Sequence, residues 1–179
     1  EFKREVNDAP ILSYIYRELK PAKHLEFGTW EGFGTALCAA SCDAEIWTIN
    51  LPDGETDAQN NPVYSEPIFN ATDTKNPNNV DMKRTDSGDS IGWRYRAAGY
   101  SGRVHQILAD SRNWDTSDIV PGFFDSVLVD GGHTADVVAN DTEKAIPLLK
   151  SGGILIWHDF CPDAEAINEL EAPRGDRKS

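Results

Sequence analysis

The chain has 179 residues, of which 39% are hydrophobic and 26% are charged, and its formal net charge is −13. This length and this hydrophobic content are enough for one domain with a buried core, and they exclude a chain that is disordered throughout. The negative charge is unfavourable for contact with a nucleic-acid backbone or an anionic membrane surface. We therefore expect a single acidic globular domain whose partners are neither nucleic acids nor membranes.

Cysteine usage and the absence of long apolar runs point to a cytoplasmic protein. No run approaches the roughly 20 apolar residues of a membrane span, and no apolar signal-peptide core follows the charged N-terminus. The cysteines, Cys38, Cys42 and Cys161, do not form a disulfide framework. Cys38 and Cys42 lie one helical turn apart, but no second pair completes a metal site, so we interpret them as core residues.

The first third of the chain predicts two helices and two strands. Asp8 is the expected N-cap of a helix that has Pro10 in its first turn and runs to about Leu19. A strand over residues 24–27, a glycine-rich turn, a helix through residues 36–40 and a strand over residues 45–50 follow. A polar stretch from 51 to about 88 is predicted to be a long loop.

The remaining sequence continues the alternation of helices and strands. Residues 89–98 predict a helix, and residues 134–150 predict a longer one that ends at Gly152 and Gly153. Strands are expected over residues 103–109, 123–129 and 154–157, and another helix begins at Pro162. Such alternation is typical of an α/β, Rossmann-like, doubly wound parallel sheet, for which we expect the strand order 3-2-1-4-5.

The first strand leads into a glycine-rich turn that is a candidate cofactor site, because ligands bind outside the carboxyl ends of the strands in such sheets. Glu26, Gly28 and Gly32 form the pattern E-x-G-x-x-x-G. Dinucleotide-binding turns instead carry G-x-G-x-x-G. The spacing therefore favours S-adenosylmethionine over a nicotinamide cofactor.

Polar residues also follow the third, fourth and fifth strands, as Asp110-Ser111, as Asp130-Gly131-Gly132-His133 and as His158-Asp159. With the glycine-rich turn and the Gly-Gly-led last strand, this pattern resembles the class I S-adenosylmethionine-dependent methyltransferases. The resemblance spans roughly residues 23–163. It is strongest to the small-molecule O-methyltransferase branch and to the related cephalosporin-hydroxylase-like proteins.

The resemblance implies a role for each strand end in binding the cofactor. The methionine and ribose parts would lie against the first turn, and Asp110, with Ser111 beside it, would accept a hydrogen bond from the adenine amino group. At the end of the second strand the family usually has an acid for the ribose hydroxyls, and Asn50 stands there, so ribose binding would be weaker or shared with Asp53. The full set of expected cofactor residues is Glu26, Gly28, Thr29, Gly32, Asn50, Asp110, Ser111 and Asp130.

Two routes remain open for removing the proton of the methyl acceptor, which we expect to be a hydroxyl of a small molecule or a sugar. His133 or His158 is a candidate general base near neutral pH. Alternatively, Asp130 and Asp159 bind Mg²⁺, which lowers the pKa of a coordinated hydroxyl. The metal-dependent members of the family carry acids at these two strand ends.

Relatives of this kind continue after the fifth strand with a helix and two more strands, so we expect a C-terminally truncated domain. The strand at residues 154–157 would then be an open sheet edge, which predicts pairing with a second copy or aggregation. The altered Asn50 and the missing strands also leave an alternative function open. In that case the chain is a non-catalytic cofactor-binding domain of a larger biosynthetic protein. A nicotinamide-dependent oxidoreductase is the third alternative.

Overall fold

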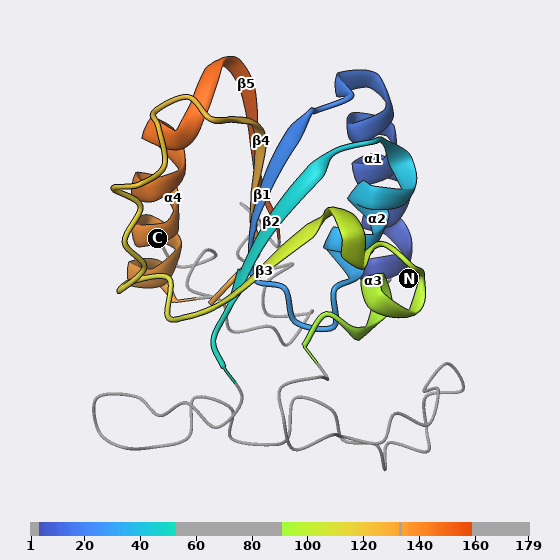
Figure 1. The fold of residues 1–179 in the computed structure, drawn as a ribbon, viewed down its shortest axis with the longest axis horizontal. Helices are drawn as coiled ribbons and strands as arrows, with labels where there is room; N and C mark the ends of the chain where they lie inside the picture. Colours follow the sequence, from blue (N-terminus) through green and yellow to red (C-terminus); the bar gives the residue numbers. More distant parts are fainter. Residues whose placement is uncertain (1–3, 53–90, 133, 159–179) are drawn as a thin grey trace, which may run out of the picture.

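Five parallel strands form a single sheet at the centre of the molecule (Figure 1). The structure is a computed structural model that describes residues 4–52, 91–132 and 134–158. Its sheet has the order β3-β2-β1-β4-β5, which confirms the predicted Rossmann-like topology. The strands are β1 (Lys23–Phe27), β2 (Glu45–Asn50), β3 (Val104–Leu108), β4 (Phe124–Val129) and β5 (Leu149–Trp157).

Helices cover both faces of this sheet (Figure 1). On one face lie α1 (Arg4–Leu19), α2 (Phe33–Ser41) and the short α3 (Trp93–Ala97), and on the other lies α4 (Ala135–Leu148). A 3₁₀ turn, η1 (Ser101–Arg103), leads into β3. The long polar loop and the helix expected from Pro162 fall outside the described residues.

The central strand β1 divides its side chains between the two faces by the period-2 alternation of a strand. Leu25 and Phe27 are fully buried in an apolar cluster that includes Ala145 and Leu148 of α4. His24 and Glu26, equally buried, point to the face covered by α1 and α2. The α4 face of β1 is therefore apolar, and its opposite face carries a buried polar layer.

His24 shows how that polar layer is satisfied. Its Nε2 lies 3.3 Å from the hydroxyl oxygen of Tyr16 in α1, and its Nδ1 lies 2.8 Å from the hydroxyl oxygen of Ser126 in β4. Burial lowers the pKa of His24 to about 3, so the imidazole is neutral at physiological pH. A neutral ring with both nitrogens hydrogen-bonded can be buried without leaving an unpaired charge.

Two predicted helix ends were wrong. The helix α1 begins at Arg4, not at Asp8, and contains Pro10 in its interior. The Asp8 carboxylate lies 3.0 Å from Nε2 of His158, so a long-range contact uses the side chain that a local pattern assigned to capping. The helix α4 ends at Leu148, and Gly152 belongs to β5, where its φ of 82° accompanies a bulge opposite Phe124 and Ser126.

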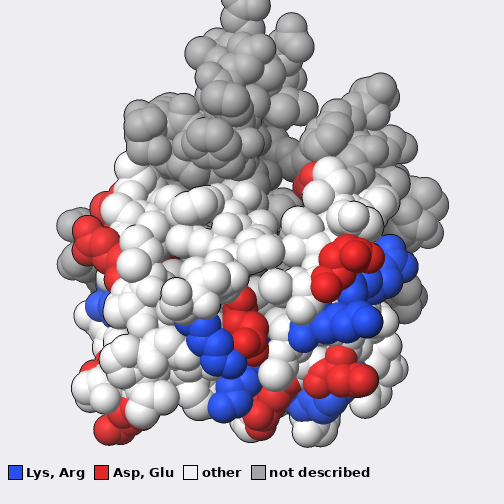
Figure 2. Space-filling model, turned by 90° about the horizontal axis from the view of Figure 1, so that it is seen from above, with Lys and Arg blue, Asp and Glu red and all other residues white. Residues whose placement is uncertain are grey.

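The edge of the sheet at which the strands begin carries acidic and basic side chains side by side (Figure 2). Asp125, near the start of β4, accepts hydrogen bonds from Nζ of Lys150 at 2.6 Å and from the backbone N–H groups of Ala22 and Lys23 at 3.0 and 2.8 Å.

None of the helices in the described ranges has the length and apolar character of a membrane span.

The strand β5 is an outer strand of the described sheet, and its Ile154 and Trp157 are 39% and 47% exposed. The open edge expected here from the sequence stays a prediction, because residues 159–179 lie outside the described ranges. The association of copies through it stays a prediction.

The C-terminal end of α2 is capped from a distance by one guanidinium group. Arg103 donates hydrogen bonds to the carbonyl oxygens of Ala39, Cys42 and Ala44 at 2.8, 2.9 and 3.2 Å. We expect Arg103→Met to lower the free energy of unfolding by about 2–3 kcal/mol, because these carbonyls lose a charged donor. Denaturant unfolding measures the change. The exposed Arg17→Met serves as control and should stay within about 0.5 kcal/mol of the parent chain; equal losses in both variants would contradict the capping role.

Candidate functional site

The glycine-rich turn after β1 lies against the backbone that follows β4. Gly28 has a φ of 97°, and a Cβ at this position would lie 2.0 Å from the carbonyl oxygen of Asp130. Its N–H donates to the carbonyl oxygen of Ile49 at 2.8 Å, and the N–H of Asp130 donates to that of Phe27 at 2.8 Å. Glycine is therefore required at position 28 by this close approach of two strand ends.

Asn50 ties the end of β2 to the same turn. Its Oδ1 accepts the N–H of Trp30 at 2.9 Å, and its Nδ2 donates to the carbonyl oxygen of Leu51 at 2.8 Å. An ionised aspartate would keep the first hydrogen bond but has no donor for the second. The amide at this position thus has a structural reason that the sequence pattern did not reveal.

Glu26 lies beneath the turn and connects β1 to the first turn of α2. Its carboxyl group is 1% exposed and accepts hydrogen bonds from the hydroxyl groups of Thr35 and Thr48, the latter at 3.0 Å. Burial raises the pKa of Glu26 to about 8, with a smaller increase from the charge of Asp130 and a partial offset from the hydrogen bonds with Thr35 and Thr48. The N-cap residue Gly32 has no side chain, and the hydroxyl of Thr35 in the first turn of α2 donates to Glu26 instead, so the carboxyl group connects the start of this helix to β1.

The turn also docks on the start of α3. The carbonyl oxygens of Trp30 and Glu31 accept the N–H groups of Gly92 and Arg94 at 2.7 and 2.9 Å, and Arg94 forms an ion pair with Glu31. A Cβ on Gly32 would lie 2.7 Å from Cα of Gly92. The segment that carries the expected methionine-binding residues is therefore held on three sides, by β2, β4 and α3.

Thr29 is placed within the polar layer under the turn. Its hydroxyl oxygen lies 2.7 Å from that of Thr48 and accepts Nε2 of Gln106 at 2.9 Å. The residue is 2% exposed. In this structure its side chain supports the turn from below.

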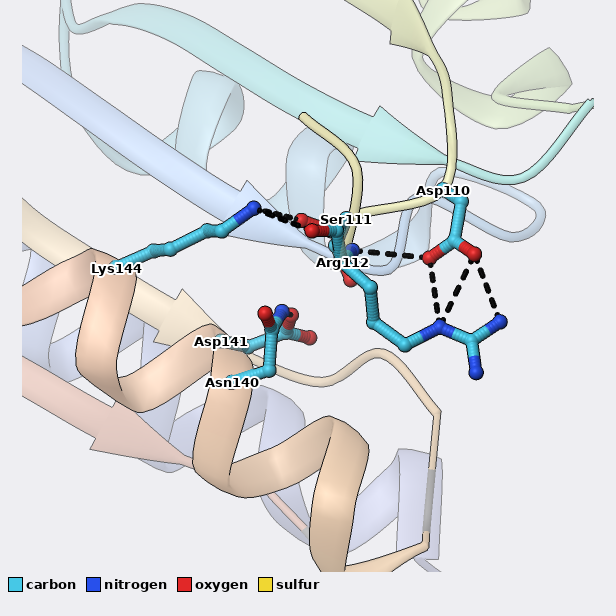
Figure 3. Close-up of polar contacts among 6 residues, drawn as sticks. All are labelled: Asp110, Ser111, Arg112, Asn140, Asp141 and Lys144. Atoms are coloured by element: carbon cyan, nitrogen blue, oxygen red, sulfur yellow. Dashed lines mark hydrogen bonds and ion pairs between the residues drawn. The ribbon is translucent and has the colours of Figure 1, made fainter. Parts of the chain in front are cut away.

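At the end of β3, Asp110 forms a two-pronged ion pair with Arg112 (Figure 3). Nε of Arg112 lies 3.0 Å from both carboxylate oxygens, Nη2 lies 2.7 Å from Oδ2, and the backbone N–H of Arg112 donates to Oδ1 at 2.9 Å. These hydrogen bonds hold the pKa of Asp110 below its usual value, so the group is ionised at neutral pH. An incoming adenine amino group would share this carboxylate with the guanidinium.

Two residues of α4 that the sequence did not single out reach the same turn. Nζ of Lys144 lies within hydrogen-bonding distance of three backbone carbonyl oxygens after β3, of which Figure 3 shows those of Ser111 and Arg112. Asp141 is 1% exposed and lies beside Gly131. In the sequence both residues look like the polar positions of an amphipathic helix. A charged residue on the side of α4 expected to be buried was the only signal that could have identified Asp141.

At the ends of β4 and β5, His158 lies between two carboxylates. Its Nδ1 is 3.0 Å from Oδ1 of Asp130, and its Nε2 is 3.0 Å from Oδ2 of Asp8. His133 and Asp159 lie outside the described residues. Within the described ranges no three His, Cys, Asp or Glu side chains gather as a metal site would require.

The sequence model of a methyltransferase domain family matches residues 25–160, which include every strand end just described. The chain belongs to this family of methyltransferase domains. The match confirms the resemblance inferred from the strand-end residues. No curated protein sequence matches the chain.

Solved structures with the methyltransferase fold are similar to this domain at low sequence identity. The O-methyltransferase TomG of Streptomyces achromogenes, in complex with S-adenosylmethionine, has a TM-score of 0.59 and 17% identity over 96% of this chain and 63% of its own. A Bacillus cereus O-methyltransferase in complex with S-adenosylhomocysteine has a TM-score of 0.59 and 14% identity over 96% and 64%. A Podospora anserina methyltransferase bound to S-adenosylhomocysteine has a TM-score of 0.51 and 18% identity over 84% of this chain and 51% of its own. The chain thus spans between 51% and 64% of these three proteins.

The raised pKa of Glu26 in this methyltransferase domain predicts a stability that falls as the pH rises. The folded pKa is about 8, whereas an unfolded glutamate titrates near about 4.3. Between these values the folded chain binds the proton more strongly, so its advantage is complete below the unfolded pKa and is lost as the pH rises through the folded pKa.

We expect Glu26→Gln to flatten this dependence between about pH 5 and 8, an effect of a few kcal/mol, because glutamine does not titrate. Denaturant unfolding at pH 5, 6.5 and 8 measures the slope. The exposed Glu18→Gln is the matched control and should keep the slope of the parent chain. The same slope in Glu26→Gln would show that Glu26 does not titrate in this range.

Proposed function

We propose that this chain transfers the methyl group of S-adenosylmethionine to a hydroxyl group of a small molecule or a sugar. Its family, and its likeness in fold to O-methyltransferases bound to this cofactor or its product, support the proposal. The strand ends fit such a cofactor, because Asp110 and Asp130 offer partly exposed acceptor oxygens at one sheet edge, with side chains 15% and 28% exposed. When bound, the cofactor supplies an electrophilic methyl group, and the protein has to align the acceptor and remove its proton.

The pair formed by Asp130 and His158 is the observation that carries the proposed chemistry. A carboxylate at one imidazole nitrogen fixes the ring and its tautomer, and it stabilises the imidazolium that forms when the other nitrogen takes a proton. Nδ1 of His158 lies 3.0 Å from Oδ1 of Asp130, within ion-pair distance, although the two atoms are not aligned as a hydrogen bond in this structure. In this mechanism Nε2 of His158 accepts the proton of the acceptor hydroxyl.

Asp8 lies on the side of His158 from which an acceptor would approach Nε2. The acceptor hydroxyl therefore replaces the Asp8 carboxylate when it binds. Since Asp8 belongs to α1, this helix borders the acceptor site in our proposal.

Magnesium activation of the acceptor is the alternative route, with Asp130 and Asp159 as ligands. A metal at Asp130 would compete with His158 for the same carboxylate. Activity that a chelator abolishes and Mg²⁺ restores would favour the metal, and activity indifferent to the chelator would favour His158.

Cofactor binding is tested by calorimetric titration of the chain with S-adenosylhomocysteine and, separately, with NAD. We expect saturable binding of S-adenosylhomocysteine and none of NAD, because the turn has the spacing E-x-G-x-x-x-G. Asp110→Ala should weaken the binding by about 1–3 kcal/mol through the loss of an acceptor. Binding of NAD alone would overturn the proposed function.

The role of His158 is tested by replacing it with asparagine and measuring transfer of a labelled methyl group to a panel of phenolic and sugar hydroxyls. We expect kcat to fall by about 10²–10⁴-fold, the usual contribution of a general base, with little change in the affinity for S-adenosylhomocysteine. His133→Asn is the matched control for the other candidate base. A large loss in His133→Asn alone would move the base to that residue, and a parent chain that binds the cofactor product but transfers to no acceptor would favour the non-catalytic alternative.

A further inference from the structure

The ammonium group of Lys144 lies against the backbone carbonyl oxygens of the turn after β3 (Figure 3). Nζ of Lys144 donates to the carbonyl oxygens of Ser111, Arg112 and Trp114 at 2.5, 3.0 and 2.8 Å. A lysine ammonium has three N–H donors, and all three are used on the backbone of this one turn. The conformation of the turn therefore depends on a side chain that comes from α4, more than 30 residues away in sequence.

Asp141, three residues before Lys144, holds the same turn from its other side. It is 1% exposed, and burial raises its pKa, while hydrogen bonds with Ser111 and Asn140 and the charge of Lys144 act in the opposite direction. Nδ2 of Asn140 donates to its Oδ1 at 2.8 Å. A Cβ on Gly131 would lie 3.0 Å from its Oδ2, so the carboxylate also touches the backbone after β4.

The contacts of Lys144 and Asp141 with this turn also position Asp110. The backbone N–H of Arg112, whose carbonyl oxygen is bound by Lys144, donates to Oδ1 of Asp110. The orientation of the Asp110 carboxylate is thus coupled to a turn whose carbonyl groups are fixed from α4. Trp114, at the end of this turn, packs edge-on against Phe27 with a centroid distance of 5.9 Å, which anchors the turn to the centre of the sheet.

We propose that Lys144 and Asp141 are positioning residues that fix the turn at residues 110–114 and thereby make the cofactor site selective for adenine. This inference rests on the proposed function. If the Asp110 carboxylate is held in one orientation, it can distinguish adenine from hypoxanthine. The amino group of adenine donates a hydrogen bond to the carboxylate, whereas the carbonyl oxygen of hypoxanthine faces it as a second hydrogen-bond acceptor and repels it. A turn that is free to move relieves that repulsion and loses the selectivity.

The experiment compares S-adenosylhomocysteine with S-inosylhomocysteine by calorimetric titration of the parent chain and of Lys144→Met. The two ligands differ only at one edge of the base, where the 6-amino group becomes a carbonyl and N1 gains a proton. We expect the variant to bind S-adenosylhomocysteine roughly tenfold or more weakly, with a smaller loss of affinity for S-inosylhomocysteine. The dissociation constant of S-inosylhomocysteine divided by that of S-adenosylhomocysteine should therefore fall. Lys150→Met is the matched control, since Lys150 pairs with Asp125 at the opposite edge of the sheet, and both constants should stay unchanged.

Thermal unfolding without ligand shows whether each variant is folded, and Lys144→Gln, which keeps two shorter donors, replaces Lys144→Met if the latter does not fold. An equal loss of affinity for both ligands, or no loss for either, overturns the positioning role while leaving the proposed function intact. Failure of the parent chain to bind either ligand overturns the proposed function, and this inference with it.

Discussion

The buried carboxyl group of Glu26 connects the elements from which the candidate site is built. It lies at the end of the central strand, accepts hydrogen bonds from Thr35 of α2 and Thr48 of β2, and supports the turn between β1 and α2. A Cβ on Gly34 would lie 2.2 Å from its Oε1. The glycines at positions 28 and 34 are therefore required by the packing of the neighbouring strand end and of this carboxyl group, whether or not a ligand is bound.

The sheet itself was predictable from the sequence because each of its strands is a short segment rich in apolar residues. The strand at residues 45–50 has the predicted bounds, and the order of the five strands is the one expected of a Rossmann-like sheet. Local patterns failed where a distant residue competed for a side chain. Asp8 was expected to cap a helix and contacts His158 instead, 150 residues away in sequence.

The candidate site was predictable in position but not in detail. Strand ends locate Asp110, Asp130 and His158 at one edge of the sheet, since parallel strands bring their carboxyl ends together. The partners of these residues come from helices whose sequence signals only an amphipathic surface. Lys144 is one such case, because nothing in its neighbourhood along the chain indicates three carbonyl groups that lie 30 to 33 residues earlier.

The pairing of β1 with β4 has a consequence for the order in which this chain can fold. His24 in β1 is paired with Ser126, and the hydrogen bond between their side chains spans 102 residues. As the chain leaves the ribosome, β1 and β2 emerge long before β4, so the central strand has one unpaired edge beside apolar side chains throughout that interval. Stable native structure then has to wait for residues 124–129. A nascent chain halted before that point would present the middle of its future sheet to other molecules, and we expect it to depend on chaperones for that time.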